Sequence, residues 1–396
     1  MKVCFDTFGC RLNRAEALEE EAKYVASGWE LTQRHSDADL IVVRGCSVTA
    51  RAQRDCEKLI SHLRRHYPTK RLVVQGCLPK SLKTAPDPKI PGKPPADSAD
   101  ALPARTARAY LKVQDGCNCG CTYCIVPRFR GKSVSFDFEN VIDKAKRFVD
   151  SGYREIVVTG CNLSLYSSQG RHLPDLVAAL SRLSPARIRL GSVEPGAQAL
   201  ETVSAMSENA SVCRFLHLSA QSGSESVLAA MKRPYRAKDI DALARKALEL
   251  MPDIRLGCDI ICGFPGELDI DHLATKSMLQ RLPFTNAHVF PYSERPGTPA
   301  ASFRDVVPKP VRHARAHELT DIAMRSQIKY AKKFTGRTVE IIVERNKPAA
   351  GWTGEYLWCS ATGAIADAPR KSSVKIQVTS AGHDGTLKGR ITDNGG

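Results

Sequence analysis

A short cysteine-rich segment places the tightest constraint on this chain. Residues 113–124 read VQDGCNCGCTYC, and within them Cys117, Cys121 and Cys124 have the spacing C-x3-C-x2-C. A compact loop with this spacing can bring three thiolates to three irons of a cubane cluster and leave the fourth iron open to a small-molecule ligand. The spacing therefore predicts a [4Fe-4S] cluster held by these three cysteines.

Two other interpretations of this segment stay open. Cys119 lies between the first two ligands, so the pattern Cys117-x-Cys119-x-Cys121 offers alternative ligands or a zinc site. The segment is also compatible with a group of reduced thiols that holds no metal.

The first 80 residues alternate between strand-like and helix-like patterns. Short apolar runs at residues 3–5, 40–43 and 72–74 are typical of buried strands. Helical patterns cover residues 14–27 and 51–65. This alternation predicts a doubly wound parallel α/β domain with its ligands at the carboxyl ends of the strands.

A Gly-Cys dipeptide follows each of these three apolar runs, and the cysteines are Cys10, Cys46 and Cys77. The carboxyl ends of parallel strands lie on one rim of a sheet, so the three thiols should meet there. We expect them to hold a second [4Fe-4S] cluster, again with one open iron. The alternative is three unrelated buried cysteines, since cysteine is often a core residue.

The rest of the chain divides by composition. We expect an N-terminal domain over residues 1–82, a proline-rich linker over 83–106, a partial barrel with a basic helix over 107–334, and a small β domain over 335–396. Strand candidates of the partial barrel are residues 110–113, 156–159, 188–191, 215–218, 259–261 and 287–290. Because a helical pattern follows each of them, we expect an open (β/α)6 barrel with its active site at the carboxyl ends of the strands.

Positive charge is concentrated in two segments. The chain carries a net charge of +16. Residues 51–83 hold nine Lys/Arg against two acids (+7), and residues 309–334 hold seven against two (+5). Concentrated positive charge is typical of proteins that bind nucleic acid. The alternative is an ordinary solvated helix face.

The sequence also indicates a compartment. No stretch approaches the roughly 20 apolar residues of a membrane helix, and the first residues lack a signal-peptide core. We therefore expect a cytoplasmic protein without a membrane partner. In that compartment the fourteen cysteines are better explained by metal or redox chemistry than by disulfides.

Taken together, the cysteine motifs resemble those of the methylthiotransferases in the radical S-adenosylmethionine (SAM) superfamily. The resemblance runs nearly end to end. It includes TFGCRLN at 7–13, TGCN at 159–162, SVEP at 192–195, QSG at 221–223, DIICGFPGE at 259–267 and FPYSERPGTP at 290–299. The opening motif is most similar to the branch that modifies N6-threonylcarbamoyladenosine in tRNA. The isopentenyladenosine and ribosomal-protein branches differ after that cysteine.

The resemblance implies a reaction and its partners. The cluster on Cys117, Cys121 and Cys124 would give an electron to SAM, and the second cluster would hold the sulfur. A methylthio group would be inserted at C2 of the modified adenosine next to the anticodon. The expected partners are the anticodon stem–loop of a tRNA, an electron donor and a sulfur donor. The C-terminal domain would be a TRAM-like RNA-binding barrel.

The resemblance also implies which residues contact SAM. They are Tyr123, Thr159, Gly160, Asn162, Ser192, Glu194, Gln221, Gly263 and Gly266. Turn chemistry or helix capping is the alternative role for any one of them.

For RNA, we expect the phosphates to be bound by Lys329, Lys332 and Lys333, and an unpaired base to stack on Trp352. Within the same superfamily, the alternatives are the isopentenyladenosine and ribosomal-protein enzymes. The alternative from another class is a zinc-binding RNA-binding protein.

Overall fold

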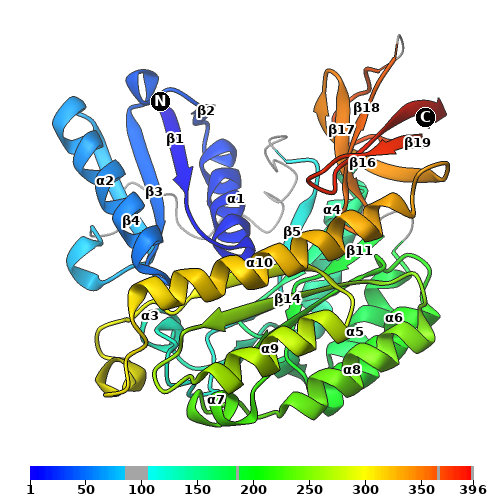
Figure 1. Ribbon diagram of the computed structural model, residues 1–396. Helices are drawn as coiled ribbons and strands as arrows, with labels where there is room; N and C mark the ends of the chain where they lie inside the picture. Colours follow the sequence, from blue (N-terminus) through cyan, green and yellow to red (C-terminus); the bar gives the residue numbers. More distant parts are fainter. Residues whose placement is uncertain (85–105, 184–186, 364–365, 394–396) are drawn as a thin grey trace.

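Parallel strands organise the first two thirds of the chain in the computed structural model, which describes residues 1–84, 106–183, 187–363 and 366–393 (Figure 1). The predicted linker at 83–106 falls almost entirely outside the described residues. No helix within the described ranges is long and apolar enough to cross a membrane.

The N-terminal sheet has the order β2-β1-β3-β4, with every pairing parallel. Its elements are β1 (Lys2–Thr7), α1 (Arg11–Ala26), β2 (Glu30–Thr32), β3 (Leu40–Cys46), α2 (Ala50–His66) and β4 (Arg71–Cys77). Side chains of β3 alternate between two cores: Ile41 packs with Ile60 of α2 on one face, and Val42 packs with Tyr24 of α1 on the other. The doubly wound arrangement is thus confirmed.

The central part is an open arc of parallel strands in the order β5-β8-β11/β12-β13-β14-β15. Its strands are β5 (Ala109–Lys112), β8 (Glu155–Thr159), β11 (Arg187–Leu190), β12 (Ser192–Val193), β13 (Phe215–Gln221), β14 (Arg255–Cys262) and β15 (Phe284–Pro291). Its helices are α3 (Val126–Arg130), α4 (Phe138–Asp150), α5 (Leu173–Ser181), α6 (Ala197–Glu208), α7 (Glu225–Ala230), α8 (Ala237–Leu250) and α9 (Asp269–Arg281). The partial barrel expected from the sequence is therefore confirmed.

Two short antiparallel strand pairs that were not predicted lie beside the arc. They are β6 (Gln114–Asp115) with β7 (Val134–Ser135), and β9 (Ser167–Ser168) with β10 (Arg171–His172). Strands of two residues are too short to show an alternating pattern.

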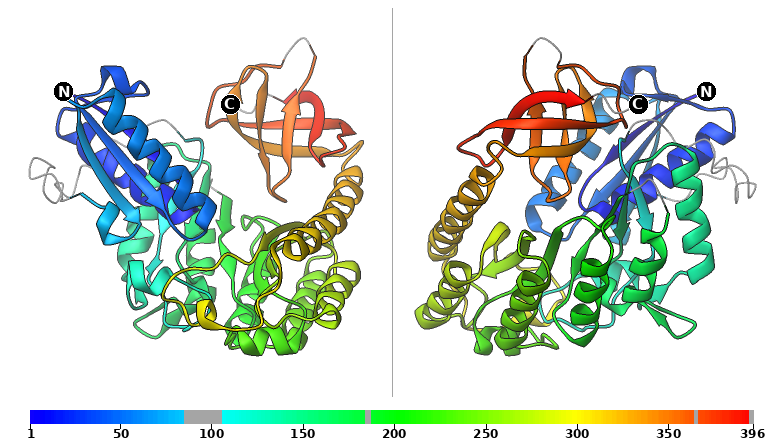
Figure 2. Two further views of the ribbon diagram at one scale, coloured as in Figure 1. Left: turned by 60° about the vertical axis from the view of Figure 1, so that its left-hand side comes forward. Right: turned by 90° about the vertical axis from the view of Figure 1, so that its right-hand side faces the viewer.

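The helix α10 (Lys309–Lys332) packs along β15 and leads into the C-terminal part. There β16 (Thr338–Asn346), β17 (Ala349–Thr353), β18 (Trp358–Ala361), β19 (Ser373–Ala381) and β20 (Leu387–Asp393) close into a barrel in the order β16-β17-β18-β20-β19. The small β-barrel is as predicted, and it includes β17 although the start of this strand (Ala349-Ala350-Gly351) lacks the β-branched residues typical of strands. Figure 2 shows the N-terminal sheet and this barrel standing on the same side of the central arc.

A group of buried charged residues holds the C-terminal barrel against the central arc. Glu155 of β8 is fully buried and pairs with Arg189 at 2.7 Å and with Arg187 at 2.6 Å. Arg189 also donates to the carbonyl oxygen of Thr353 at 2.8 Å. The guanidinium of Arg189 lies 4.8 Å from the ring centroid of Tyr356. The loop after β17 is thereby fixed against the strands of the arc.

Candidate active site

The first set of cysteines lies on the carboxyl rim of the N-terminal sheet. Cys46 and Cys77 end the neighbouring strands β3 and β4 in matching register, and Cys10 precedes the first residue of α1. Gly9 has a φ of +92°, and a Cβ there would lie 2.8 Å from the Cβ of Cys46. Only glycine lets the loop before α1 approach β3 so closely. The fold thus brings together the three cysteines that were predicted to act together.

Burial raises the pKa of two of these thiols, so they ionise less readily unless a cation lies nearby. It raises the pKa of the Cys77 thiol to about 11, while the guanidinium of Arg130 acts in the opposite direction. Burial also raises the pKa of Cys46, whereas Cys10 is exposed. Metal binding requires thiolates and releases their protons. Three soft sulfur donors around one rim fit an iron–sulfur cluster.

The second set lies in the loop between β6 and α3. Gly116 begins this loop with a φ of +66°, and a Cβ there would lie 2.0 Å from the carbonyl oxygen of Lys132. Cys121 is buried, while Cys117 and Cys124 are half-buried. Burial raises the pKa of Cys124 to about 11, and the charges of the other two thiols add to this rise. The three thiols therefore lie close enough to interact electrostatically.

Neither set of thiols has the tight spacing of a single-ion site. In the described residues, the triplets of potential ligand atoms that all lie within 4.8 Å of one another are Cys4–Asp6–His35 and His217–Asp259–His288. The four ligands of zinc lie at about 2.0–2.3 Å from the ion, so their donor atoms approach more closely than that limit. A cubane cluster presents its irons at separate corners and suits a wider set of thiols. Which metal each set holds stays a prediction.

Cys119 lies among predicted SAM-binding residues. Its thiol donates to Oε2 of Glu194 at 3.5 Å, and Nδ2 of Asn162 donates to its sulfur at 3.3 Å. Its backbone N–H also donates to Sγ of Cys117 at 3.5 Å. Cys119 thus contacts two of the residues that were predicted to bind SAM.

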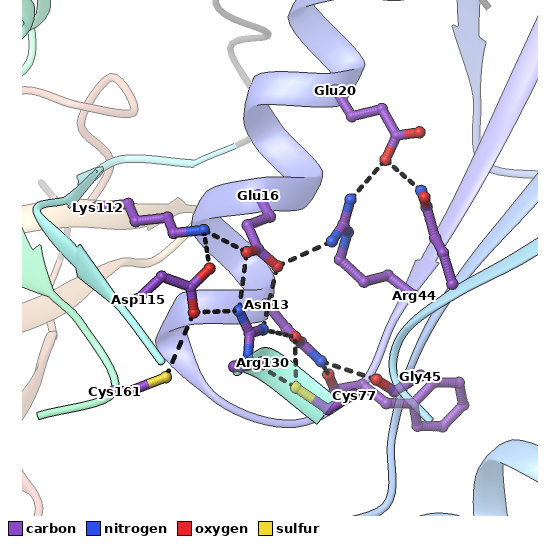
Figure 3. A network of polar contacts seen from close by, with 12 residues as sticks. Asn13, Glu16, Glu20, Arg44, Gly45, Cys77, Lys112, Asp115, Arg130 and Cys161 are labelled. Carbon is purple, nitrogen blue, oxygen red and sulfur yellow. Dashed lines mark hydrogen bonds and ion pairs between the residues drawn. The ribbon is translucent and has the colours of Figure 1, made fainter. Parts of the chain in front are cut away.

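One arginine links Cys77 on the N-terminal rim to Asp115 at the start of the barrel loop (Figure 3). Nε of Arg130, at the end of α3, donates to Sγ of Cys77 at 2.8 Å. Nη1 of Arg130 donates to Glu16 of α1 at 2.9 Å and to Asp115 at 3.0 Å. Asp115 in turn accepts from the backbone N–H of Gly116 at 2.8 Å. A continuous chain of charged contacts therefore runs from the N-terminal rim to the start of the barrel loop.

A second arginine contacts the barrel set. Nη1 of Arg233 donates to Sγ of Cys121 at 3.0 Å and to the hydroxyl of Tyr123 at 3.3 Å. Its guanidinium also forms an ion pair with Glu194. Each set of thiols thus receives a hydrogen bond from an arginine that is held in turn by a carboxylate.

Sequence reasoning missed Arg130 and Arg233. Both directly precede a turn residue, Gly131 and Pro234 respectively. This signal is weak because turn residues are common.

The predicted SAM-binding residues fall into two groups. Those that follow β8 and β11 lie together, and they are Thr159, Gly160, Asn162, Ser192 and Glu194. Nδ2 of Asn162 donates to Oε2 of Glu194 at 2.8 Å, and Tyr123 joins them through Arg233.

The remaining three lie at the ends of β13 and β14. Gln221 has a φ of +63°. A Cβ on Gly263 would lie 2.4 Å from Cγ of Arg312, whereas nothing lies within 4 Å of such an atom on Gly266. Glycine at 263 therefore permits the close approach of α10. A contact of these three residues with SAM stays a prediction.

The predicted RNA-binding residues lie in two places. Lys329, Lys332 and Lys333 are exposed at the end of α10. Trp352 is half-buried, and its ring stacks on Tyr356 with centroids 4.4 Å apart. Arg108 also lies over the Trp352 ring at 5.8 Å. Trp352 thus lies next to the charged residues that hold the C-terminal barrel against the arc. Its stacking on a base stays a prediction.

Comparison with known families identifies both cysteine-bearing parts. A family model described as "Radical SAM superfamily" matches residues 111–279, and one described as "Uncharacterized protein family UPF0004" matches residues 2–91. Among solved structures, the radical S-adenosylmethionine methyltransferase TsrM from Kitasatospora setae has a TM-score of 0.54 at 13% identity. It covers 76% of this chain and 77% of its own. That likeness concerns the fold alone.

Curated relatives match over most of their length. Proteins named threonylcarbamoyladenosine tRNA methylthiotransferase MtaB are 32% identical in Chlamydia pneumoniae, over 85% of both chains, and 29% identical in Thermotoga maritima, over 86% of both. A protein named tRNA-2-methylthio-N(6)-dimethylallyladenosine synthase from Novosphingobium aromaticivorans is 30% identical over 97% of this chain and 96% of its own. With a cysteine loop on a partial barrel and a cysteine rim on a parallel sheet, this similarity shows that the chain belongs to the radical SAM methylthiotransferases.

Proposed function

We propose that this protein modifies tRNA by placing a methylthio group on C2 of N6-threonylcarbamoyladenosine next to the anticodon. The names of the relatives point to either threonylcarbamoyladenosine or dimethylallyladenosine. The segment TFGCRLN at 7–13 favours the first, by its resemblance to that branch. The observation that supports the chemistry is the bond of Arg130 to Cys77 of one set and to Asp115, which lies two residues before Cys117 of the other.

In this proposal Cys117, Cys121 and Cys124 hold the [4Fe-4S] cluster that belongs to the radical SAM family. Such a cluster supplies a low-potential electron for the cleavage of SAM. The residues of the chain orient and shield that chemistry. Arg233 offsets negative charge at Cys121, and Asn162 and Glu194 present an amide and a carboxylate toward the cofactor side.

The second set, Cys10, Cys46 and Cys77, is proposed to hold a further [4Fe-4S] cluster. Its role would be to carry the sulfur that enters the product. Arg130 would offset negative charge at Cys77 there, as Arg233 does at the first cluster. The reaction also needs an electron donor and a sulfur donor, since the chain's own residues supply neither in a catalytic cycle.

We propose that the RNA partner is the anticodon stem–loop of a tRNA. We also propose that the reaction takes place in the cytoplasm. Lys329, Lys332 and Lys333 offer an exposed cationic surface for phosphates. Of the basic segment 51–83, Arg51 and Arg54 at the start of α2 and Lys80 just after β4 lie near the rim that carries Cys46 and Cys77.

Nucleoside mass spectrometry tests this proposal. We expect tRNA from a strain without the protein to lack 2-methylthio-N6-threonylcarbamoyladenosine and to retain its unmethylthiolated precursor. Loss of the isopentenyl product, or of a methylthio group on a ribosomal protein, would instead identify one of the alternative substrates. Anaerobically purified protein should be brown and contain iron and sulfide. Colourless protein with stoichiometric zinc would support the zinc-binding alternative.

A further inference from the structure

A polar pocket of about 300 Å³ opens beside Cys10. Three parts of the molecule line it: Cys10, Arg11 and Arg14 from the N-terminal part, Tyr110 from β5, and Glu344 and Arg370 from the C-terminal barrel. Its size is at the lower end of the range for small-ligand pockets. A group bound here would touch the rim that carries the first set of cysteines.

The pocket has an excess of positive charge. Its acid, Glu344, is already paired with Arg108 at 2.5 Å. The guanidinium of Arg11 is also engaged, since it lies 5.2 Å from the ring centroid of Tyr356. Arg14 and Arg370 are exposed, and neither forms an ion pair with another residue in the described parts of the chain. Two guanidinium groups from different domains thus remain available to one anion.

We propose that Arg14 and Arg370 bind the carboxylate of the threonylcarbamoyl group, so that this pocket selects an acid-bearing adenosine. The inference rests on the proposed function and deepens it. Arginine binds carboxylates through paired charge-assisted hydrogen bonds, whereas an isopentenyl group offers no polar atom to either residue. An isopentenyl group in the pocket would remove water from the two arginines without offering them a new partner, and this cost disfavours its binding.

The chemistry of the base agrees with this placement. In adenine, only N1 separates C2 from C6, so a substituent on N6 lies within one ring of the carbon that reacts. A pocket beside Cys10 is therefore in reach of that substituent when C2 faces the rim of thiols.

A phosphate of the RNA backbone is the other source of an anion for the two arginines. Two anticodon stem–loops, identical except for A or N6-threonylcarbamoyl-A next to the anticodon, distinguish these sources. Binding of both would be measured with the anaerobic, cluster-loaded full-length protein, for the parent and for Arg14→Gln and Arg370→Gln. Arg345→Gln is the matched control, because it removes the same charge from an exposed residue of the same barrel outside the pocket.

The parent should bind the modified stem–loop more tightly than the unmodified one. Each pocket variant should reduce that preference by about tenfold, while its affinity for the unmodified RNA and its iron content stay at parental values. Arg370→Lys should keep part of the preference, and Arg345→Gln all of it. Since the two arginines lie in different domains, either variant decides the question if the other fails to fold.

Three results would overturn the inference. An equal loss of affinity for both RNAs in the pocket variants would identify a phosphate contact. An unchanged preference in both variants, or a parent protein without any preference, would also contradict it. A failure of the proposed function looks different. In that case the parent would modify an isopentenyl stem–loop and leave the threonylcarbamoyl one unreacted, whatever the arginine variants do.

Discussion

Nε of Arg130 donates to Sγ of Cys77 at 2.8 Å, across the boundary between the central arc and the N-terminal sheet. The same guanidinium pairs with Glu16 on one side of that boundary and with Asp115 on the other. Only 8% of its side chain is exposed. One buried cation therefore joins the rim that carries Cys77 to Asp115, two residues before Cys117.

Replacing Arg130 by Met should destabilise the protein by about 1–3 kcal/mol, since Glu16, Asp115 and the buried thiol of Cys77 each lose a charged hydrogen-bond donor. The loss stays in this range because Lys112 still pairs with both carboxylates. Urea unfolding measures this loss. Arg147→Met on α4 is the matched control, because Arg147 is exposed and its loss should change stability by less than about 0.5 kcal/mol. Equal stability of the two variants would mean that Arg130 does not hold the two parts together.

The two sets of cysteines should be separable by mutation. Replacement of Cys117, Cys121 and Cys124 by Ala should abolish reductive cleavage of SAM. Replacement of the set on the N-terminal rim should spare SAM cleavage and stop sulfur transfer, because the two sets lie on different sheets. The measurement is 5′-deoxyadenosine formation together with methylthiolated nucleoside. Loss of SAM cleavage in the N-terminal triple variant, with the barrel cluster intact, would contradict this division.

Cys119 should be dispensable for iron binding. In the structure its thiol contacts Glu194 and Asn162, two residues that were predicted to bind SAM. Cys119→Ser should therefore keep the parental ratio of iron to protein. Cys121→Ser, the control with the same chemical change at a predicted ligand, should lose iron. Depleted iron in Cys119→Ser would show that the ligand set includes Cys119.

Glu155 should be essential for docking the C-terminal barrel. Its side chain is fully buried, and Glu155→Gln would remove the carboxylate that faces Arg187 and Arg189. The expected loss is about 3–5 kcal/mol in urea unfolding. Glu139→Gln is the control: its side chain is 63% exposed in an ion pair with Arg171, a surface contact worth at most about 1 kcal/mol. Similar losses in the two variants would refute the docking role.

The lowered pKa of Glu155 leads us to expect that the stability of the fold depends on pH. Burial alone would raise the pKa of Glu155, but Arg189 and Arg187 outweigh it and hold the pKa below its ordinary value of 4.5. A carboxyl with a lowered native pKa stabilises the fold fully above the ordinary pKa, and that stabilisation fades as the pH falls below it. The parent should thus lose stability below about pH 4.5, and Glu155→Gln should lose less over the same interval.

Helices and strands could be predicted from the sequence where a segment has a clear pattern of apolar residues. The apolar runs that became β3 and β4 are β-branched and end in Gly-Cys, so strand, direction and thiol position all followed from sequence. The strand β2 (Glu30–Thr32) contains a single apolar residue and could not be distinguished from a loop.

The contacts of Arg130 and Arg233 were not predictable for a different reason. Their contacts with Cys77 and Cys121 join residues more than 50 positions apart, and no periodicity within a segment encodes such a pairing. The pocket beside Cys10 is likewise formed by three parts of the chain, so its charge is a property of the fold rather than of any motif.

The end of α10 should carry much of the electrostatic attraction to RNA. Lys329, Lys332 and Lys333 are exposed within its last turns and the residue that follows, and in the described parts of the chain none of them pairs with a carboxylate. Each lysine that meets a phosphate releases a counterion, so affinity falls with salt in proportion to such contacts. Reversing all three charges to Glu should weaken tRNA binding and flatten its dependence on salt.

The matched control reverses Lys146, Arg147 and Arg182, which are exposed on α4 and at the end of α5 and change the net charge by the same amount. Titrations of tRNA at several salt concentrations would compare the slopes of the two variants with that of the parent. A decrease confined to the α10 variant supports a specific phosphate contact, and an equal decrease in both reflects net charge alone. If the α10 variant keeps both the affinity and the salt slope of the parent, this helix has a purely structural role and the RNA binds along another surface.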